Sequence, residues 1–152
     1  MFVENYMHHG VHSCRVGDTL AKAAETMRDG HCGFLVVLDD EGKIVSVLTD
    51  RDVCMAAEAS TKSSRRTPIP PPYQAIITVR PSDAIAHAEE LMRHHHLRRL
   101  PVTDPDGRPV GVLSITDLAR AAFPGWSAEV GGVTPLSVLG LLAIIDRSRP
   151  HV

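Results

Sequence analysis

The sequence predicts a mixed α/β (α+β) fold of two tandem β-α-β-β-α repeats related by a pseudo-twofold axis, followed by a C-terminal apolar helix. The main observation is that the chain matches itself without a gap at a shift of 65 residues, which lays Asp18 over Asp83 and Asp52 over Asp117. Helical and strand patterns also follow one another in the same order in both copies. Together these features indicate one duplicated supersecondary unit whose two copies pack against each other.

The first copy shows helical spacing of apolar residues, then two short apolar runs around a polar turn, then a second helical pattern. We expect a helix capped by Asp18 or Thr19 and ended by Gly30, strands at Phe34–Leu38 and Ile44–Leu48, and a helix from Thr49 or Asp50 to about Ala59. The second copy repeats this order. We expect a helix capped by Ser82 or Asp83, strands at Leu100–Thr103 and Val110–Leu113, and a helix from Ser114 to Ala122. Short strands near Val11–Cys14 and Ile76–Val79 precede the two copies.

These patterns set the expected boundaries: a first repeat at residues 1–59, a polar and proline-rich connector at 60–74, a second repeat at 75–123, and an extension at 124–152. The extension carries a predicted helix near 135–146, with Thr134 as cap and Pro135 at its first position. Because this helix is apolar nearly all round, we expect it to be buried within the protein or its dimer.

Composition excludes several classes of function. A net charge of −2 and a pI of about 6.5 argue against a nucleic-acid partner, which would need a basic face. The absence of 18 consecutive apolar residues argues against a membrane span. Three cysteines without CxxC spacing, and no signal-peptide pattern, predict a reduced, cytoplasmic protein in which Cys32 and Cys54 are core residues.

Chemically suggestive residues recur at one place in each copy. In "TDRD" and "SITD" a hydroxyl residue opens a helix and an aspartate follows three positions later, as Thr49 with Asp52 and Ser114 with Asp117. One reading is helix capping, since Thr and Ser are good N-caps and Asp suits the first turn. The other is ligand binding, because a carboxylate can accept hydrogen bonds from both hydroxyls of a ribose. The two readings are compatible.

The repeated segment resembles the CBS domain, and two together resemble a Bateman module. The resemblance rests on the DxL/I…A…M helix, the apolar hairpin with Asp and Gly in its turn, the [ST]xxD helix start, and the lead-in "VENYM". It implies a regulatory module that binds AMP, ADP, ATP or S-adenosylmethionine in clefts between paired repeats. The family also commonly associates into flat dimeric discs, so we expect a homodimer.

The resemblance and the motifs give a set of expected ligand-binding residues. In one cleft these are Ile77, Thr78, Arg98, Arg99, Leu100, Pro101, Ser114, Thr116 and Asp117; in the other they are Ser13, Cys14, Phe34, Leu35, Thr49, Arg51 and Asp52. Because Arg98 and Arg99 have Gly33 and Phe34 as counterparts, we expect the second copy to form the better phosphate site.

We therefore expect a non-catalytic sensor of adenine nucleotides that signals to a partner protein. No nucleophile–base pair and no glycine-rich phosphate loop are present, so no enzyme activity and no required cofactor are expected. A ligand-free dimerisation scaffold and a sensor of S-adenosylmethionine are the alternatives. No metal site is expected, because three adjacent histidines, His94 to His96, point about 100° apart on a helix and cannot close one site.

Overall fold

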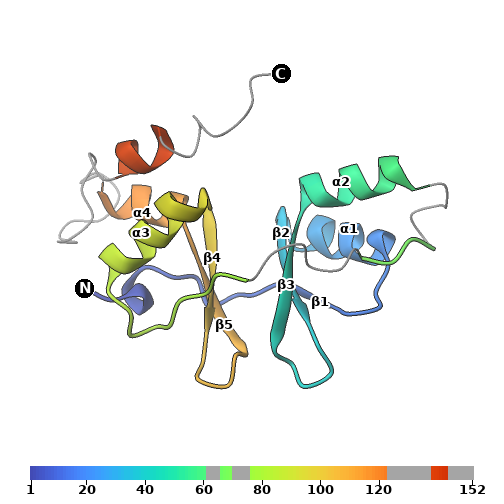
Figure 1. The fold of residues 1–152 in the computed structure, drawn as a ribbon, viewed down its shortest axis with the longest axis horizontal. Helices are drawn as coiled ribbons and strands as arrows, with labels where there is room; N and C mark the ends of the chain where they lie inside the picture. Colours follow the sequence, from blue (N-terminus) through green and yellow to red (C-terminus); the bar gives the residue numbers. More distant parts are fainter. Residues whose placement is uncertain (61–65, 70–75, 123–137, 144–152) are drawn as a thin grey trace. The chain divides into compact units, whose positions relative to one another are not determined.

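The computed structural model describes residues 1–60, 66–69, 76–122 and 138–143. By contacts the chain divides into two compact units. Unit 1 comprises Met1–His9, Ile77–Pro105 and Val110–Val152, and unit 2 comprises Gly10–Ile76 and Asp106–Pro109. Each unit holds one copy of the repeat (Figure 1). The mixed α/β fold with two repeats is confirmed.

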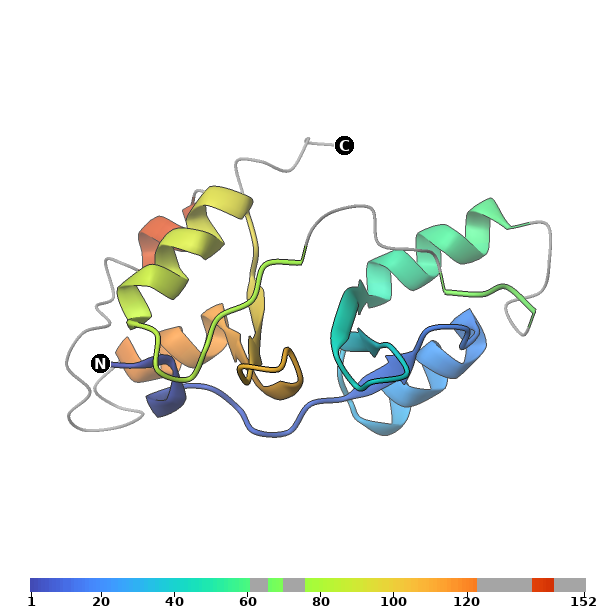
Figure 2. The same cartoon turned by 60° about the horizontal axis from the view of Figure 1, so that its bottom comes forward.

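Unit 2 contains a three-stranded sheet in the order β1-β2-β3 with two helices on one of its faces (Figure 2). Strand β1 runs parallel to β2, and β3 returns antiparallel to β2 with an irregularity between Val37 and Leu38. The elements are β1 (Ser13–Arg15), α1 (Leu20–Asp29), β2 (Phe34–Leu38), β3 (Ile44–Thr49) and α2 (Asp50–Ala59).

The core of unit 2 lies between this sheet and its helices. Strand β2 is buried along its centre: Leu35 and Val37 belong to the core cluster, and Val36, which points to the opposite face, is buried as well. Helix α1 contributes the side chains that recur at helical spacing. The buried cluster consists of Cys14, Ala23, Met27, Leu35, Val37 and Leu48.

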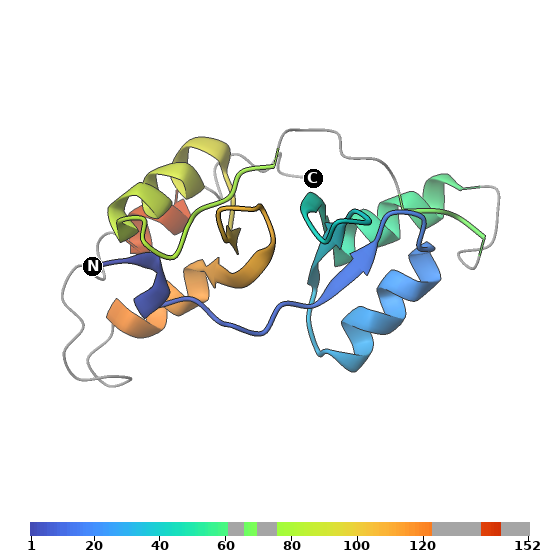
Figure 3. The same ribbon diagram turned by 90° about the horizontal axis from the view of Figure 1, so that it is seen from below.

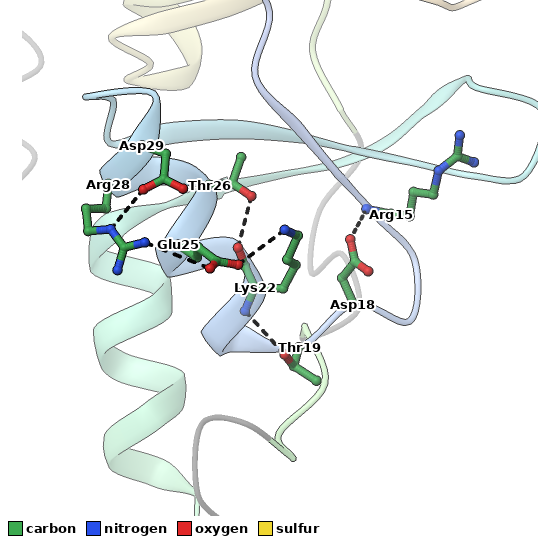
Figure 4. Close-up of polar contacts among 8 residues, drawn as sticks. All are labelled: Arg15, Asp18, Thr19, Lys22, Glu25, Thr26, Arg28 and Asp29. Atoms are coloured by element: carbon green, nitrogen blue, oxygen red, sulfur yellow. Dashed lines mark hydrogen bonds and ion pairs between the residues drawn. The ribbon is translucent and has the colours of Figure 1, made fainter.

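Helix α1 begins where the sequence places its cap. The Thr19 hydroxyl accepts a hydrogen bond from the Lys22 amide at 3.3 Å, and Asp18 accepts one from the Arg15 amide at 2.8 Å (Figure 4). The solvent side of the helix carries ion pairs between exposed side chains, such as Lys22 with Glu25 at 3.2 Å. Exposed pairs of this kind contribute about 0.2–1 kcal/mol at most, so the cap and the buried face define the helix.

Unit 1 repeats the arrangement with a two-stranded sheet of β4 and β5. Its elements are η1 (Val3–Asn5), α3 (Ile85–His95), β4 (Arg99–Thr103), β5 (Pro109–Ser114) and α4 (Ile115–Ala122). The predicted strand at Ile76–Val79 is reduced to a parallel bridge between Val79 and Val102. That bridge has the register of Cys14 with Val37 in β1 and β2, shifted by 65 residues.

The first residues of the chain belong to unit 1, although in the sequence they stand at the start of the first repeat (Figure 3). The Val3 amide donates to the Asp83 carbonyl, and the backbone of His8 pairs with that of Val112. Val3 is fully buried and Tyr6 nearly so, both in the core of unit 1. The remaining core residues are Val79, Ile85, Ala88, Met92, Leu100, Val102, Leu113, Ile115, Leu118, Ala122, Val138 and Leu141.

The apolar C-terminal segment is helical at residues 138–143, and the rest of the predicted helix near 135–146 lies outside the described residues. Val138 and Leu141 are buried in the core of unit 1, at 2% and 0% exposure. Leu139 and Leu142 are exposed at 57% and 37%. The segment therefore uses one face within its own chain, as the sequence analysis allowed, and leaves the other face to solvent.

The start of α3 differs from the prediction, whereas α1 ends before Gly30 as expected. The N-cap of α3 is Ala84, without a side-chain cap bond, because Asp83 instead accepts a hydrogen bond from the Arg80 amide in the preceding turn. Gly30 keeps a right-handed conformation after α1, and the left-handed residue is His31, at φ 47°. His96 holds the equivalent place after α3, at φ 55°.

These histidines explain one part of the self-match. A residue with positive φ lets the chain turn back after the helix, so that the Cys32 amide reaches the Met27 carbonyl and the Leu97 amide reaches the Met92 carbonyl, both at 2.9 Å. Histidine enters this conformation more readily than most residues that carry a Cβ. The repeated histidine thus has a backbone role in both copies.

We expect His96→Gly to stabilise the protein by about 0.5 kcal/mol, because glycine removes the Cβ penalty of the left-handed conformation while adding some unfolded-state entropy. Thermal melting would show a higher midpoint. The matched control is His95→Gly, within the last turn of α3, which should lower stability by about 0.3–0.5 kcal/mol. A lower midpoint for His96→Gly would contradict this account of the helix end.

Candidate functional site

The [ST]xxD motif of the first repeat joins β3 to α2. The Asp52 amide donates to the Thr49 hydroxyl oxygen at 3.2 Å. In return, Asp52 Oδ2 accepts hydrogen bonds from the Thr49 amide at 2.8 Å and from the Thr49 hydroxyl at 2.6 Å. The capping interpretation of this motif is therefore correct, and it uses one of the two carboxylate oxygens.

The motif of the second repeat has the same geometry. The Asp117 amide donates to the Ser114 hydroxyl oxygen at 3.2 Å, and Asp117 Oδ2 accepts from the Ser114 amide at 2.9 Å and the Ser114 hydroxyl at 2.6 Å. In each repeat the first helical amide also donates to the residue before the sheet strand, Ile115 to Arg98 and Asp50 to Gly33. Each motif is thus fixed to the start of its neighbouring strand.

The Oδ1 atoms of the two aspartates have different contacts. Asp52 is exposed, and no described residue forms a hydrogen bond or ion pair with its Oδ1. Asp117 is 7% exposed, and its Oδ1 lies 2.5 Å from His8 Nε2 and 4.0 Å from Arg120 Nη1. The lead-in segment of the chain therefore covers the second motif with a histidine whose own side chain is 62% exposed.

The first turn of α2 is acidic, and its backbone amides already donate hydrogen bonds within the protein. Asp50 Oδ1 accepts a hydrogen bond from the Arg51 amide at 2.8 Å. Its Oδ2 lies over Gly33, where an added Cβ would be 2.8 Å away, so the missing side chain of Gly33 makes room for this carboxylate. Amides 49 to 52 all donate within the protein.

The first turn of α4 has a different character. Ile115 stands where Asp50 does and is buried in the core of unit 1. Arg98 stands where Gly33 does, and both Arg98 and Arg99 are exposed. Among the described residues, nothing accepts a hydrogen bond from the Thr116 amide, the counterpart of the Arg51 amide.

The expected ligand-binding residues differ in how exposed their side chains are. Leu35, Leu100 and Pro101 are buried, so a ligand beside them would meet their backbone rather than their side chains. The Cys14 side chain is likewise buried in the core of unit 2. The half-buried or exposed members of the set are Ser13, Phe34, Thr49, Arg51, Asp52, Ile77, Thr78, Arg98, Arg99, Ser114 and Thr116. Phe34 lies beside Thr49 as its register partner.

Sequence reasoning missed two residues at these motifs. His8 belongs to no motif in the sequence, yet its backbone pairs with β5 and its ring contacts Asp117. Asp50 was considered only as a possible helix cap. The self-match could have indicated its importance, because this acidic residue in one copy aligns with the apolar Ile115 in the other.

Two further expectations concern cysteine and metal ligands. Cys32 packs against the core of unit 2, as expected, but Cys54 is exposed because α2 buries no residue fully and turns this position to solvent. Within the described parts of the chain, no group of three His, Cys, Asp or Glu side chains could hold a metal ion. No helix in those parts is long and apolar enough to cross a membrane.

The family model for the CBS domain matches residues 3–59 and 70–123. The chain belongs to the CBS domain family. An uncharacterized 17.7 kDa protein of Acidianus ambivalens is 33% identical over 118 residues, which span 74% of this chain and 68% of that protein. The CBS domain protein TA0289 of Thermoplasma acidophilum has the same fold, with a TM-score of 0.77, 24% identity and coverage of 99% of this chain and 79% of the other.

Other CBS relatives differ in what accompanies the repeats. Hypoxic Response Protein I, solved with two coordinated zinc ions, has a TM-score of 0.69 and 28% identity over 79% of this chain and 98% of its own. CBSX2, solved in complex with AMP, has a TM-score of 0.63 and 25% identity over 80% and 95%. Arabinose 5-phosphate isomerase KdsD of Pseudomonas aeruginosa is 33% identical, but the match spans only 37% of that enzyme.

We expect Cys14 to resist thiol reagents in the native protein, whereas Cys54 should react. Burial, with a smaller contribution from the nearby Asp18 charge, raises the pKa of Cys14 to about 11, so about one thiol in a thousand is ionised at pH 8. Mass spectrometry after iodoacetamide treatment would locate the label, with urea-unfolded protein as the control. Rapid native labelling of Cys14 would contradict its place in the core.

Proposed function

We propose that this CBS protein is a non-catalytic regulatory module that binds adenosine-containing ligands, AMP, ADP or ATP, at its two [ST]xxD motifs. The observation that carries the proposal is the way each aspartate is held. One carboxylate oxygen is fixed by the helix cap, and the other stays outside the cap. A ribose presents two adjacent hydroxyl donors, and an ionised carboxylate can accept both.

Preorganisation favours such binding. Because the cap fixes the aspartate before any ligand arrives, little side-chain entropy is lost when the ribose binds. The first motif offers Asp52 Oδ1 directly, next to Phe34, a partly buried aromatic side chain that can contact a base. The AMP complex of the similar protein CBSX2 supports an adenosine ligand.

The second motif needs one more step. Its Asp117 Oδ1 already meets His8, so a ribose hydroxyl must displace the imidazole or share that oxygen. For adenosine itself, the first motif should therefore fill at lower ligand concentration, even though the second repeat carries more arginines at the matching positions. Ligand binding at Asp117 would free the His8 ring while the backbone of the lead-in segment stays paired with the second repeat. This local change offers a way to signal to a partner protein or a second copy in a homodimer.

Two alternatives remain for the experiments below. S-adenosylmethionine has the same ribose, and MJ0100, which shares the fold, was solved with that compound and 5′-methylthioadenosine. A scaffold without ligand is favoured by the closed state of Asp117 and by the exposed apolar residue Met55 on α2. Adenosine compounds that fail to bind at saturating concentration would favour the scaffold.

We expect Asp52→Asn to weaken binding of adenosine ligands at the first motif by roughly 1–3 kcal/mol, because the ribose loses a charged acceptor. Asparagine keeps an oxygen that can still cap α2. Isothermal titration with AMP, ATP and S-adenosylmethionine measures the effect. The matched control is Asp40→Asn, which removes the same charge from the exposed hairpin turn of unit 2. Unaltered affinity in Asp52→Asn would place the ribose elsewhere.

We expect His8→Ala to tighten binding at the second motif up to about fivefold, because the ligand no longer competes with an exposed histidine contact of about 1 kcal/mol or less. The measurement is titration of adenosine in an Asp52→Asn background, where the second motif dominates. His9→Ala, at the exposed neighbouring position, is the control. Weaker binding in His8→Ala would mean that the imidazole contacts the ligand.

A further inference from the structure

The two motifs share one cap geometry but carry opposite charge around it. At position 33 of the first repeat, the carboxylate of Asp50 occupies the space above Gly33. At the matching position 98 of the second repeat stands an arginine, opposite the uncharged Ile115. The pair of matching positions therefore carries an acid next to a glycine in one copy, and an arginine with an apolar residue in the other.

The contrast extends over the whole turn. Side chains at positions 33, 34, 50, 51, 52 and 55 carry one net negative charge at neutral pH, even with Arg51 included. The six matching positions of the second repeat, 98, 99, 115, 116, 117 and 120, carry two net positive charges. The two sets therefore differ by three charges, and charges that lie within a Debye length of about 8 Å of a bound ligand are only partly screened at physiological ionic strength.

The backbone amides at the helix starts also differ between the two repeats. In the first repeat the Asp50 carboxylate accepts from the Arg51 amide at 2.8 Å, so an anion of the protein already occupies the start of α2. In the second repeat, no described residue accepts from the equivalent Thr116 amide. A phosphate group would therefore find a competing carboxylate at the first motif, and an available amide near cationic side chains at the second.

We propose that Asp50 makes the first repeat selective for adenosine ligands without a phosphate at the ribose 5′ position, while the second repeat accepts phosphate. This inference rests on the proposed function, because it assumes that the ribose binds at Asp52. Adenosine whose 5′ substituent is uncharged or cationic, a hydroxyl, a thioether or a sulfonium, meets no repulsion from Asp50. A phosphate, with up to two negative charges, is repelled there.

The test compares adenosine with AMP by isothermal titration. An Asp117→Asn background weakens the second motif, so that binding reports on the first. In that background AMP should bind more weakly than adenosine, and Asp50→Asn should improve AMP affinity about fivefold while leaving adenosine nearly unchanged, since one close charge repulsion of about 1 kcal/mol is removed. Asp40→Asn, with the same charge change far along the hairpin, is the control.

The reciprocal arm uses an Asp52→Asn background, in which Arg98→Gln should weaken AMP binding and spare adenosine. An AMP-to-adenosine affinity ratio that Asp50→Asn does not change would overturn the inference and leave the proposed function standing. Loss of AMP affinity in Asp50→Asn would also overturn it. If the wild-type protein binds neither adenosine nor AMP, the proposed function fails and this inference fails with it. Circular dichroism of each variant confirms that α2 is retained.

Discussion

The start of the second helix in each repeat depends on the hydrogen bonds between the hydroxyl residue and the aspartate of its [ST]xxD turn. This turn satisfies the free amides at the start of α2 and α4, which would otherwise lack acceptors. It also fixes an aspartate side chain at the edge of the sheet. Because the cap uses only one carboxylate oxygen, the same residue keeps its second oxygen outside the cap.

Duplication of this turn produces two motifs that are equal in the cap and unequal around it. Asp52 is exposed in an acidic turn, whereas Asp117 is buried, in contact with His8 and 4.0 Å from Arg120. The cap geometry cannot vary without loss of the helix start, so differences accumulate in the residues that surround it. The His8 contact with Asp117 is a further difference, because no described residue meets the second oxygen of Asp52.

The self-match and the local patterns were enough to predict most of the fold. The hairpins, the cap at Thr19 and both [ST]xxD turns depend on residues close in sequence, and these predictions are confirmed. The features that escaped prediction depend on distant contacts or on which face an element turns outward. The Tyr6 and His8 contacts join residues far apart in the chain, and the exposure of Cys54 follows from how little of α2 is covered. The αL histidines were visible only as an unexplained identity between the copies.

The docking of the N-terminal residues in unit 1 has a consequence for how the duplication can be taken apart. Val3 and Tyr6 complete a core that is otherwise built from residues beyond position 76. A fragment cut at the connector would carry the second repeat without these two side chains and would expose the apolar surface that they cover. The repeats are alike in pattern, but they are not interchangeable modules. Without the start of the chain the second repeat has an incomplete core, and without the second repeat the first residues have no core to pack into.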